Sequence, residues 1–120
     1  MAKKIFIADD SPETLELAEE TLSSLGYEVT AWETGRGALA KIKDVKPDLV
    51  ILDAVLTGVD GLSLAGQVSE DQSLKNVPIL VITAFERAKP LFGKNSRVKD
   101  FCTKPFTAEE LARSVEAALS

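Results

Sequence analysis

The 120-residue sequence has one cysteine, no long hydrophobic run, and fewer basic than acidic residues. A lone cysteine, Cys102, cannot form an internal disulfide, so a reducing compartment such as the cytoplasm is the expected location. The apolar stretch near the N-terminus, Ile5 to Ala8, is too short for a signal peptide or a membrane span. The net charge of -5 argues against direct contact with nucleic acid, whose partners are normally basic. We therefore expect a cytoplasmic protein that binds neither membrane nor nucleic acid.

Strand and helix signals alternate along the whole chain. The expected strands are residues 4–8, 27–31, 49–52, 79–83 and 98–103. The expected helices are residues 12–25, 36–45, 62–70 and the segment from a capping box at Thr107 to the C-terminus. Between residues 86 and 98, Pro90 and Gly93 interrupt any regular helix. The pattern predicts an α/β fold with a doubly wound parallel sheet and helices on both faces.

Polar residues stand at the carboxyl ends of four of the expected strands. In chain order they are Asp9-Asp10, Asp53, Thr83 and Lys104-Pro105. The second strand ends instead in Ala31-Trp32, without an acid or a base. In an open parallel sheet, ligands bind beyond the carboxyl ends of the strands, near the point where the strand order reverses. The order 2-1-3-4-5 would bring the four polar ends together and leave the second strand at the edge.

Each of these residues also has an ordinary structural explanation. Acids beside a helix N-terminus can be cap residues, Asp53 can be a turn residue, and Thr83 can be a strand former. Their common position at one end of the sheet favours a shared site. Three carboxylates need a cation, and hard oxygen ligands open to water suit Mg²⁺. A cation, a lysine and a hydroxyl group together suit a phosphoryl group, with Asp53 as the attacking nucleophile.

Over its whole length the sequence resembles a response-regulator receiver domain of two-component signalling. The resemblance rests on Asp9-Asp10, Asp53 and Gly61-Leu62 within DAVLTGVDGLSL, Thr83-Ala84, Phe101, and Lys104-Pro105 within TKPF. One such match is weak, but all of them in order at receiver spacing are highly specific. The resemblance implies a flavodoxin-like fold in which residues 1–120 form a single receiver domain.

The resemblance also implies a function in phosphorelay signalling. A histidine kinase or a histidine phosphotransfer protein would transfer phosphate to Asp53, and because the chain has no histidine, the donor must be another protein or domain. The groups that would hold Mg²⁺ are Asp10, Asp53 and the Val55 backbone carbonyl directly, and Asp9 through water. Lys104 would pair with a phosphoryl oxygen, and its bond to Pro105 would be cis.

Phosphorylation would act through a switch beside the site. The Thr83 hydroxyl, next to Ala84, would be drawn toward a phosphoryl oxygen, and Phe101 would turn into the space that it leaves. These changes would alter the face made by residues 86–98, the fifth strand and the last helix, where a downstream protein target would dock. Phe101 lacks the tyrosine hydroxyl of many relatives, so the switch would work by packing; a plain core aromatic is the alternative interpretation.

Several positions depart from the receiver pattern or vary within it. Thr57 stands where proline is usual, so the loop after Asp53 is expected to be less rigid. Arg97 stands where a glycine often ends the preceding helix, which adds to the expected irregularity of residues 86–98. Val55 and Phe85 would flank the path of the water that hydrolyses the acyl phosphate. Because both are apolar and cannot orient that water, we expect slow intrinsic dephosphorylation.

Three other kinds of protein share parts of this pattern. A flavodoxin-type flavin carrier would need hydroxyls and backbone donors after the first strand, where ADDSP repels an anion. A metal-dependent phosphatase with an aspartate nucleophile would carry it at the first strand, together with a cap insertion that this chain lacks. An interaction module of the same fold that is never phosphorylated stays open as the alternative. Beyond its own phosphorylation and slow phosphate loss, we expect no enzymatic activity.

Overall fold

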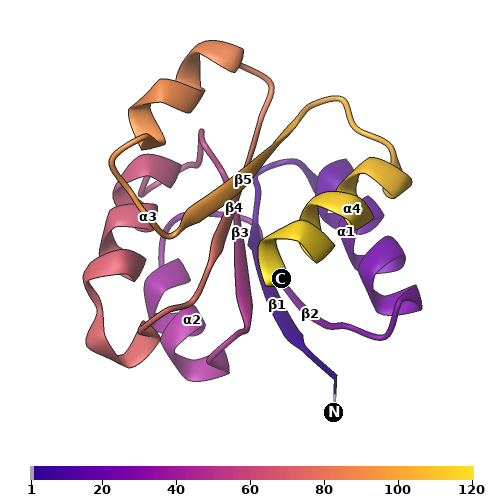
Figure 1. Cartoon of the computed structure of the whole chain (residues 1–120), viewed down its shortest axis with the longest axis horizontal. Coiled ribbons are helices and arrows are strands. Elements are labelled where there is room, and N and C mark those ends of the chain that lie inside the picture. The colour runs from indigo at the N-terminus through magenta and orange to yellow at the C-terminus, as the bar shows by residue number, and fades with distance from the viewer. Residues whose placement is uncertain (1) are drawn as a thin grey trace.

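Five parallel strands form one sheet that helices cover on both sides (Figure 1). The structure is a computed structural model and describes residues 2–120. The strands are β1 (Lys4–Ala8), β2 (Glu28–Trp32), β3 (Leu49–Asp53), β4 (Ile79–Thr83) and β5 (Val98–Thr103). Their order is β2-β1-β3-β4-β5, which confirms the predicted doubly wound sheet and its strand order.

The helices follow the strands in the chain with small shifts from the predicted bounds. They are α1 (Pro12–Ser24), α2 (Ala38–Val45), α3 (Gly61–Glu70) and α4 (Ala108–Leu119), with the short 3₁₀ helices η1 (Gln72–Leu74) and η2 (Glu86–Phe92). α2 begins after the predicted Arg36 because Gly37 takes a left-handed conformation, with φ 74°, directly before it. β2 covers Glu28–Trp32 rather than residues 27–31, because the Tyr27 amide donates to the Leu22 carbonyl at the end of α1.

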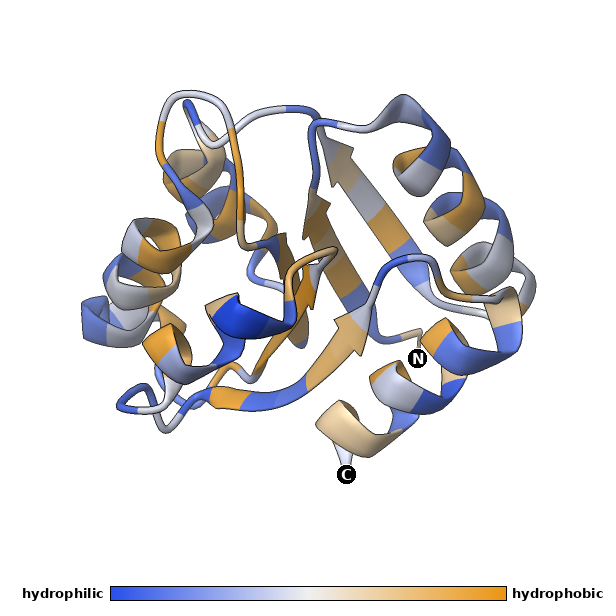
Figure 2. Cartoon of the chain, turned by 90° about the horizontal axis from the view of Figure 1, so that it is seen from above, coloured by the Kyte–Doolittle hydropathy of each residue, from blue (hydrophilic) through white to orange (hydrophobic). Residues whose placement is uncertain are grey.

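Hydrophobic side chains alternate between the two faces of the sheet and form two core clusters. The cluster beneath α2 and α3 includes Phe6, Val50, Leu52 and Val81. The cluster beneath α1 and α4 includes Ile5, Ile7, Ile51 and Ile82. In Figure 2 the apolar strands lie between helices that carry both apolar and polar residues. Burial on both faces explains the continuous apolar runs of β3 and β4, and it fixes the ends of these strands firmly in place.

The segment between β4 and β5 is irregular, as the sequence predicts. It forms the 3₁₀ helix η2, which contains Pro90 and is anchored by the buried side chain of Phe92. The Arg97 guanidinium donates to the carbonyls of Leu74 at 2.8 Å and Ser69 at 3.3 Å. Arg97 therefore ties the start of β5 to the end of α3 and to η1. Within residues 2–120, no helix has the length and hydrophobicity needed to cross a membrane.

Gly61 begins α3 at a point where two backbones touch. A Cβ atom at this position would lie 2.0 Å from the Asp53 carbonyl oxygen and 2.9 Å from the Ala54 Cα atom. Gly66, in the same helix, has open space at the corresponding position. Only the first glycine is required by packing, and the close contact fixes the start of α3 beside the loop that follows Asp53.

We expect Gly61→Ala to lower the free energy of unfolding by more than about 2 kcal/mol, because the backbone beside Asp53 would have to move. Gly66→Ala is the matched control and should raise the free energy of unfolding by about 0.5–1 kcal/mol, because alanine favours a helix interior over glycine. Urea unfolding followed by circular dichroism measures both. Wild-type stability in the Gly61→Ala protein would contradict the packing argument.

Candidate functional site

The carboxyl ends of β1, β3, β4 and β5 meet at one edge of the sheet. Asp9 follows β1 and Asp53 ends β3, and these two strands are neighbours. Thr83 ends β4, and its carbonyl accepts a hydrogen bond of 2.8 Å from the Lys104 amide just after β5. The strand order thus brings together residues that are far apart in the sequence.

The Lys104 ammonium lies between two carboxylates that belong to other strands. Its Nζ atom is 2.8 Å from Asp53 Oδ2 and 2.8 Å from Asp9 Oδ2. The peptide bond between Lys104 and Pro105 is cis, as the resemblance implies. A single cation therefore holds an acid from β1 and an acid from β3, and removing it would leave two like charges facing each other in a partly buried position.

Asp9 is fully buried and incompletely hydrogen-bonded. Its Oδ1 accepts a hydrogen bond of 2.8 Å from the Ser11 amide. Its Oδ2 is paired with Lys104 but accepts no well-directed hydrogen bond from any described residue. Burial raises the pKa of Asp9 and the charge of Asp53 adds to this, although Lys104 and the Ser11 amide oppose it. Burial alone would lower the pKa of Lys104, but its bonds to the two acids hold that pKa above its usual value.

Asp10 is exposed and contacts a different partner. The Thr57 hydroxyl donates to Asp10 Oδ2 at 2.8 Å, and the Thr57 amide nitrogen lies 3.2 Å from Oδ1 and 3.1 Å from Oδ2. The expected convergence of three acids is therefore only partly seen: Asp9 and Asp53 meet at Lys104, whereas Asp10 meets Thr57. Thr57 was expected to matter only as a departure from the usual proline. The sequence did hold one indication of this contact: threonine, unlike proline, can donate hydrogen bonds from both its backbone N–H and its hydroxyl.

The oxygen atoms at this edge suit a divalent cation. Within residues 2–120, no three histidine, cysteine, aspartate or glutamate side chains gather closely enough to form a complete metal cluster. Asp9 Oδ2 is nevertheless a buried carboxylate oxygen that accepts no well-directed hydrogen bond beyond its ion pair with Lys104, so it keeps a lone pair for a water or a cation. Carboxylates with water in the remaining positions are the ligands that Mg²⁺ prefers. The residues present therefore fit a magnesium ion.

Val55 and Phe85 are fixed beside the site through their backbone amides. The Val55 amide donates to Asp53 Oδ1 at 2.9 Å, and the Phe85 amide donates to the Thr83 hydroxyl at 3.0 Å. Both side chains are more than half exposed, at 57% for Val55 and 56% for Phe85. The Thr83 hydroxyl is thus turned toward its own loop, and apolar side chains border the site on its solvent side.

Phe101 on β5 is half-buried and held by η2. Its ring meets the Phe92 ring edge-on, with 6.2 Å between the centroids and an interplanar angle of 72°. Lys89 Nζ lies 5.7 Å from the centroid of the Phe101 ring and 3.0 Å from a Glu86 carboxylate oxygen. The Thr103 hydroxyl also donates to Glu86, at 3.0 Å. The side chains of η2 therefore cover Phe101, the residue that is expected to turn in the switch.

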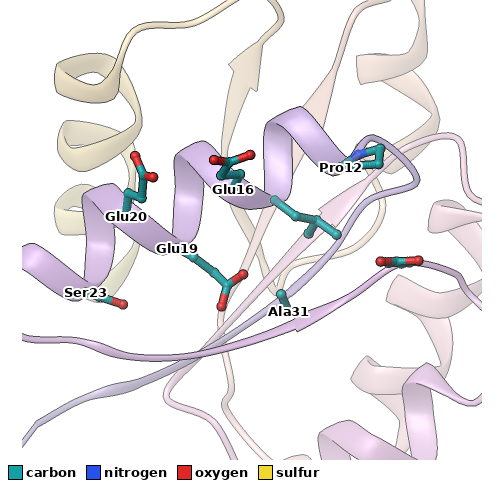
Figure 3. Close-up of a pocket in the computed structure, with 8 residues that line it drawn as sticks. Pro12, Glu16, Glu19, Glu20, Ser23 and Ala31 are labelled. Carbon is teal, nitrogen blue, oxygen red and sulfur yellow. The ribbon is translucent and has the colours of Figure 1, made fainter.

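Two surface hollows lie near these residues. The smaller one borders the site and is lined by Glu13, Thr14, Leu17, Ala84, Lys104, Pro105 and Phe106. The larger one runs between α1 and β2 and is lined in part by the acids Glu16, Glu19, Glu20 and Glu33. In Figure 3, Glu19 extends from α1 toward Ala31 of β2. The larger hollow contains none of the site residues, whereas the smaller one is lined in part by Ala84 and Lys104.

Comparisons with known proteins agree with this arrangement. The model of the response regulator receiver domain family matches residues 5–116. The chain is 29% identical to the protein PilH of Pseudomonas aeruginosa, over 98% of both chains. It is 35% identical to the phosphate regulon transcriptional regulatory protein PhoB of the same species; the match covers 99% of this chain and 52% of PhoB, so the chain spans about half the length of that relative.

Similar solved structures also include response regulators and receiver domains. The chemotaxis response regulator CheY4 of Vibrio cholerae has a TM-score of 0.92 and 27% identity, and the match covers 99% of this chain and 100% of CheY4. The receiver domain of the sensor histidine kinase PA1611 from Pseudomonas aeruginosa has a TM-score of 0.86 and 26% identity over 100% of both chains. That receiver domain holds a magnesium ion coordinated in its active-site cleft.

We expect Asp9→Asn to raise the free energy of unfolding at neutral pH in the presence of EDTA. An acid whose pKa is raised by folding destabilises the folded state as pH rises through that pKa, because the folded state binds more protons than the unfolded chain. The neutral amide removes this effect, so the gain should shrink as the pH falls toward about 4. Asp10→Asn, at an exposed position, should give no comparable gain. Urea unfolding across this pH range measures both, and a less stable Asp9→Asn protein at neutral pH would contradict the interpretation.

Proposed function

The chain belongs to the response regulator receiver domain family of two-component signalling, and on that basis we propose that Asp53 accepts a phosphoryl group from a phosphohistidine of a partner protein. The observation that carries the proposal is the Lys104 ammonium, which lies 2.8 Å from Asp53 Oδ2 and is retained from the other side by Asp9. A cation held at this distance from a carboxylate is positioned to receive a new anion that forms on that carboxylate. The donor would be a histidine kinase or a histidine phosphotransfer protein.

The transfer would be a direct displacement at phosphorus. A carboxylate oxygen of Asp53 attacks the phosphorus atom, a P–O bond forms, the P–N bond to the donor histidine breaks, and the imidazole nitrogen keeps the electron pair. Lys104 then pairs with an oxygen of the phosphoryl group while Asp9 continues to hold its ammonium. The Val55 amide, which donates to Asp53 Oδ1, keeps the attacking carboxylate in a fixed orientation.

We propose that Mg²⁺ is held by four groups: Asp9, Asp10, Asp53 and the Val55 backbone carbonyl. Of these, Asp10, Asp53 and the Val55 carbonyl would bind directly, and Asp9 would act through water. When bound, the ion would neutralise negative charge on the phosphoryl oxygens. Asp9 Oδ2, which accepts no well-directed hydrogen bond beyond its ion pair with Lys104, supports a hydrated cation at this place, and the related PA1611 receiver domain holds magnesium in its cleft.

Phosphorylation of Asp53 would be transmitted through Thr83, Ala84 and Phe101. The Thr83 hydroxyl would exchange its hydrogen bond with the Phe85 amide for one to a phosphoryl oxygen, and Phe101 would turn toward the vacated space. Because Phe101 is covered by Phe92 and Lys89, such a turn would repack η2 against β5. We propose the face made by η2, β5 and α4 as the docking surface for a downstream protein target.

The domain is a signalling module. We propose that its own chemistry is limited to catalysing its phosphorylation and a slow loss of the phosphate. Its partners would be a kinase or phosphotransfer protein on one side and a protein target on the other, met in the cytoplasm without contact to membrane or nucleic acid. An interaction module of the same fold that is never phosphorylated is the alternative.

Incubation with acetyl phosphate and Mg²⁺ should add one phosphoryl group to the wild-type protein, detected by intact-protein mass spectrometry. Asp53→Asn should abolish the addition, because the amide is not a competent nucleophile. Asp44→Asn, which changes an exposed acid at the end of α2, is the matched control and should be labelled like the wild type. An unlabelled wild-type protein would favour the interaction module over the phosphate acceptor.

The exposed apolar side chains of Val55 and Phe85 predict a long-lived acyl phosphate. We expect Val55→Asn combined with Phe85→Glu to shorten the phosphate half-life by about tenfold or more, because an amide and a carboxylate can orient the attacking water. Val55→Ala combined with Phe85→Ala is the control and tests whether loss of bulk alone admits water. Phosphate release after removal of the donor gives the half-lives, and an unchanged half-life in the polar variant would refute the argument.

A further inference from the structure

We propose that Thr57 is a positioning residue that competes with the divalent cation for Asp10. This inference rests on the proposed function only in assuming that the cation site includes Asp10. The observation behind it is that both polar donors of Thr57 point at one carboxylate. The hydroxyl donates to Asp10 Oδ2 at 2.8 Å, and the amide nitrogen lies 3.2 Å and 3.1 Å from the two carboxylate oxygens.

These contacts occupy lone pairs that a cation would need. A hydrogen bond between a hydroxyl and a carboxylate is stronger than one between neutral groups, and it must be broken or distorted when the same oxygen binds a metal. The donors also place positive partial charge next to the carboxylate, which weakens its attraction for a cation. Asp10 therefore binds the ion at the expense of its contacts with Thr57.

Thr57 cannot move with Asp10 toward the cation, because the Thr57 backbone is fixed by hydrogen bonds on the side away from Asp10. Its carbonyl accepts hydrogen bonds from the Gly35 amide at 2.8 Å and from the Thr34 hydroxyl at 2.7 Å. The two loops also touch directly: a Cβ atom at Gly35 would lie 1.8 Å from the Val59 carbonyl oxygen. The residue that contacts Asp10 is therefore part of a firmly packed pair of loops.

The three site acids are consequently held in two groups. Asp9 and Asp53 share Lys104, whereas Asp10 is held by Thr57. The absence of a compact three-carboxylate cluster within residues 2–120 agrees with this division. A divalent cation that uses all three acids must draw Asp10 away from Thr57, and the free energy of that step lowers the affinity for the ion.

The test is Thr57→Val, which removes the hydroxyl and keeps the shape and the backbone amide. We expect Mn²⁺, a spectroscopic substitute with the same preference for oxygen ligands, to bind about three- to tenfold more tightly to this variant than to the wild type. Titration of the free Mn²⁺ signal by electron paramagnetic resonance gives the dissociation constants, and competition with Mg²⁺ repeats the comparison for the proposed ion. Thr57→Ala should show the same gain if valine disturbs the loop.

Thr57→Ser is the matched control, because serine retains the hydroxyl and should bind Mn²⁺ with the wild-type affinity. An unchanged or weaker affinity in both the valine and alanine variants would overturn the proposal. Labelling of Asp53 in the wild-type protein by acetyl phosphate at saturating Mg²⁺ tests the proposed function separately. Normal labelling with unchanged affinity would contradict only the role of Thr57, whereas no Mn²⁺ binding by any of the proteins would contradict the cation site itself.

Discussion

The ion pairs of Lys104 with Asp9 and Asp53 are the interaction on which the rest of the site depends. Two carboxylates at the ends of adjacent buried strands repel each other, and Asp9 has no access to water that would screen its charge. A lysine that follows β5 supplies the compensating charge, 51 residues away from Asp53 in the sequence. It reaches that place because β5 lies beside β4, and the backbone hydrogen bond from Lys104 to Thr83 fixes the turn.

The sheet and the loops make different contributions to this arrangement. Packing on both faces of the sheet fixes the strand ends. The close contact between Gly61 and the Asp53 backbone fixes the point at which the loop after Asp53 ends and α3 begins. On its outer side the same loop is tied to residues 34 and 35 through the carbonyl of Thr57. The amide and hydroxyl of Thr57 also donate to Asp10, and these are the hydrogen bonds that a proline at this position could not make. That the loop is less rigid without proline stays a prediction.

The segment before β5 shapes the face that we propose as the docking surface. Pro90 interrupts a regular helical pattern, and the chain forms a 3₁₀ helix whose Phe92 side chain is buried. Arg97, which follows it, donates to the end of α3 and to η1. Phe101 is enclosed by Phe92 and Lys89 rather than by a smooth helix surface. A partner that docks on η2, β5 and α4 would therefore meet a surface whose shape depends on aromatic packing and on the ion pair between Lys89 and Glu86.

The sequence by itself determined the type and order of the main elements and which polar residues stand at the carboxyl ends of the strands. Continuous apolar runs identify β3 and β4, caps at Ser11 and Thr107 identify helix starts, and parallel topology places Asp9, Asp53, Thr83 and Lys104 at one edge. Only the tertiary structure decided the later start of β2, the burial of Asp9, its shared cation with Asp53, and the separate contact of Asp10 with Thr57. Periodicity reports which face of an element is apolar. These features depend instead on which side chains from distant loops come into contact, and a local sequence pattern holds no information about such contacts.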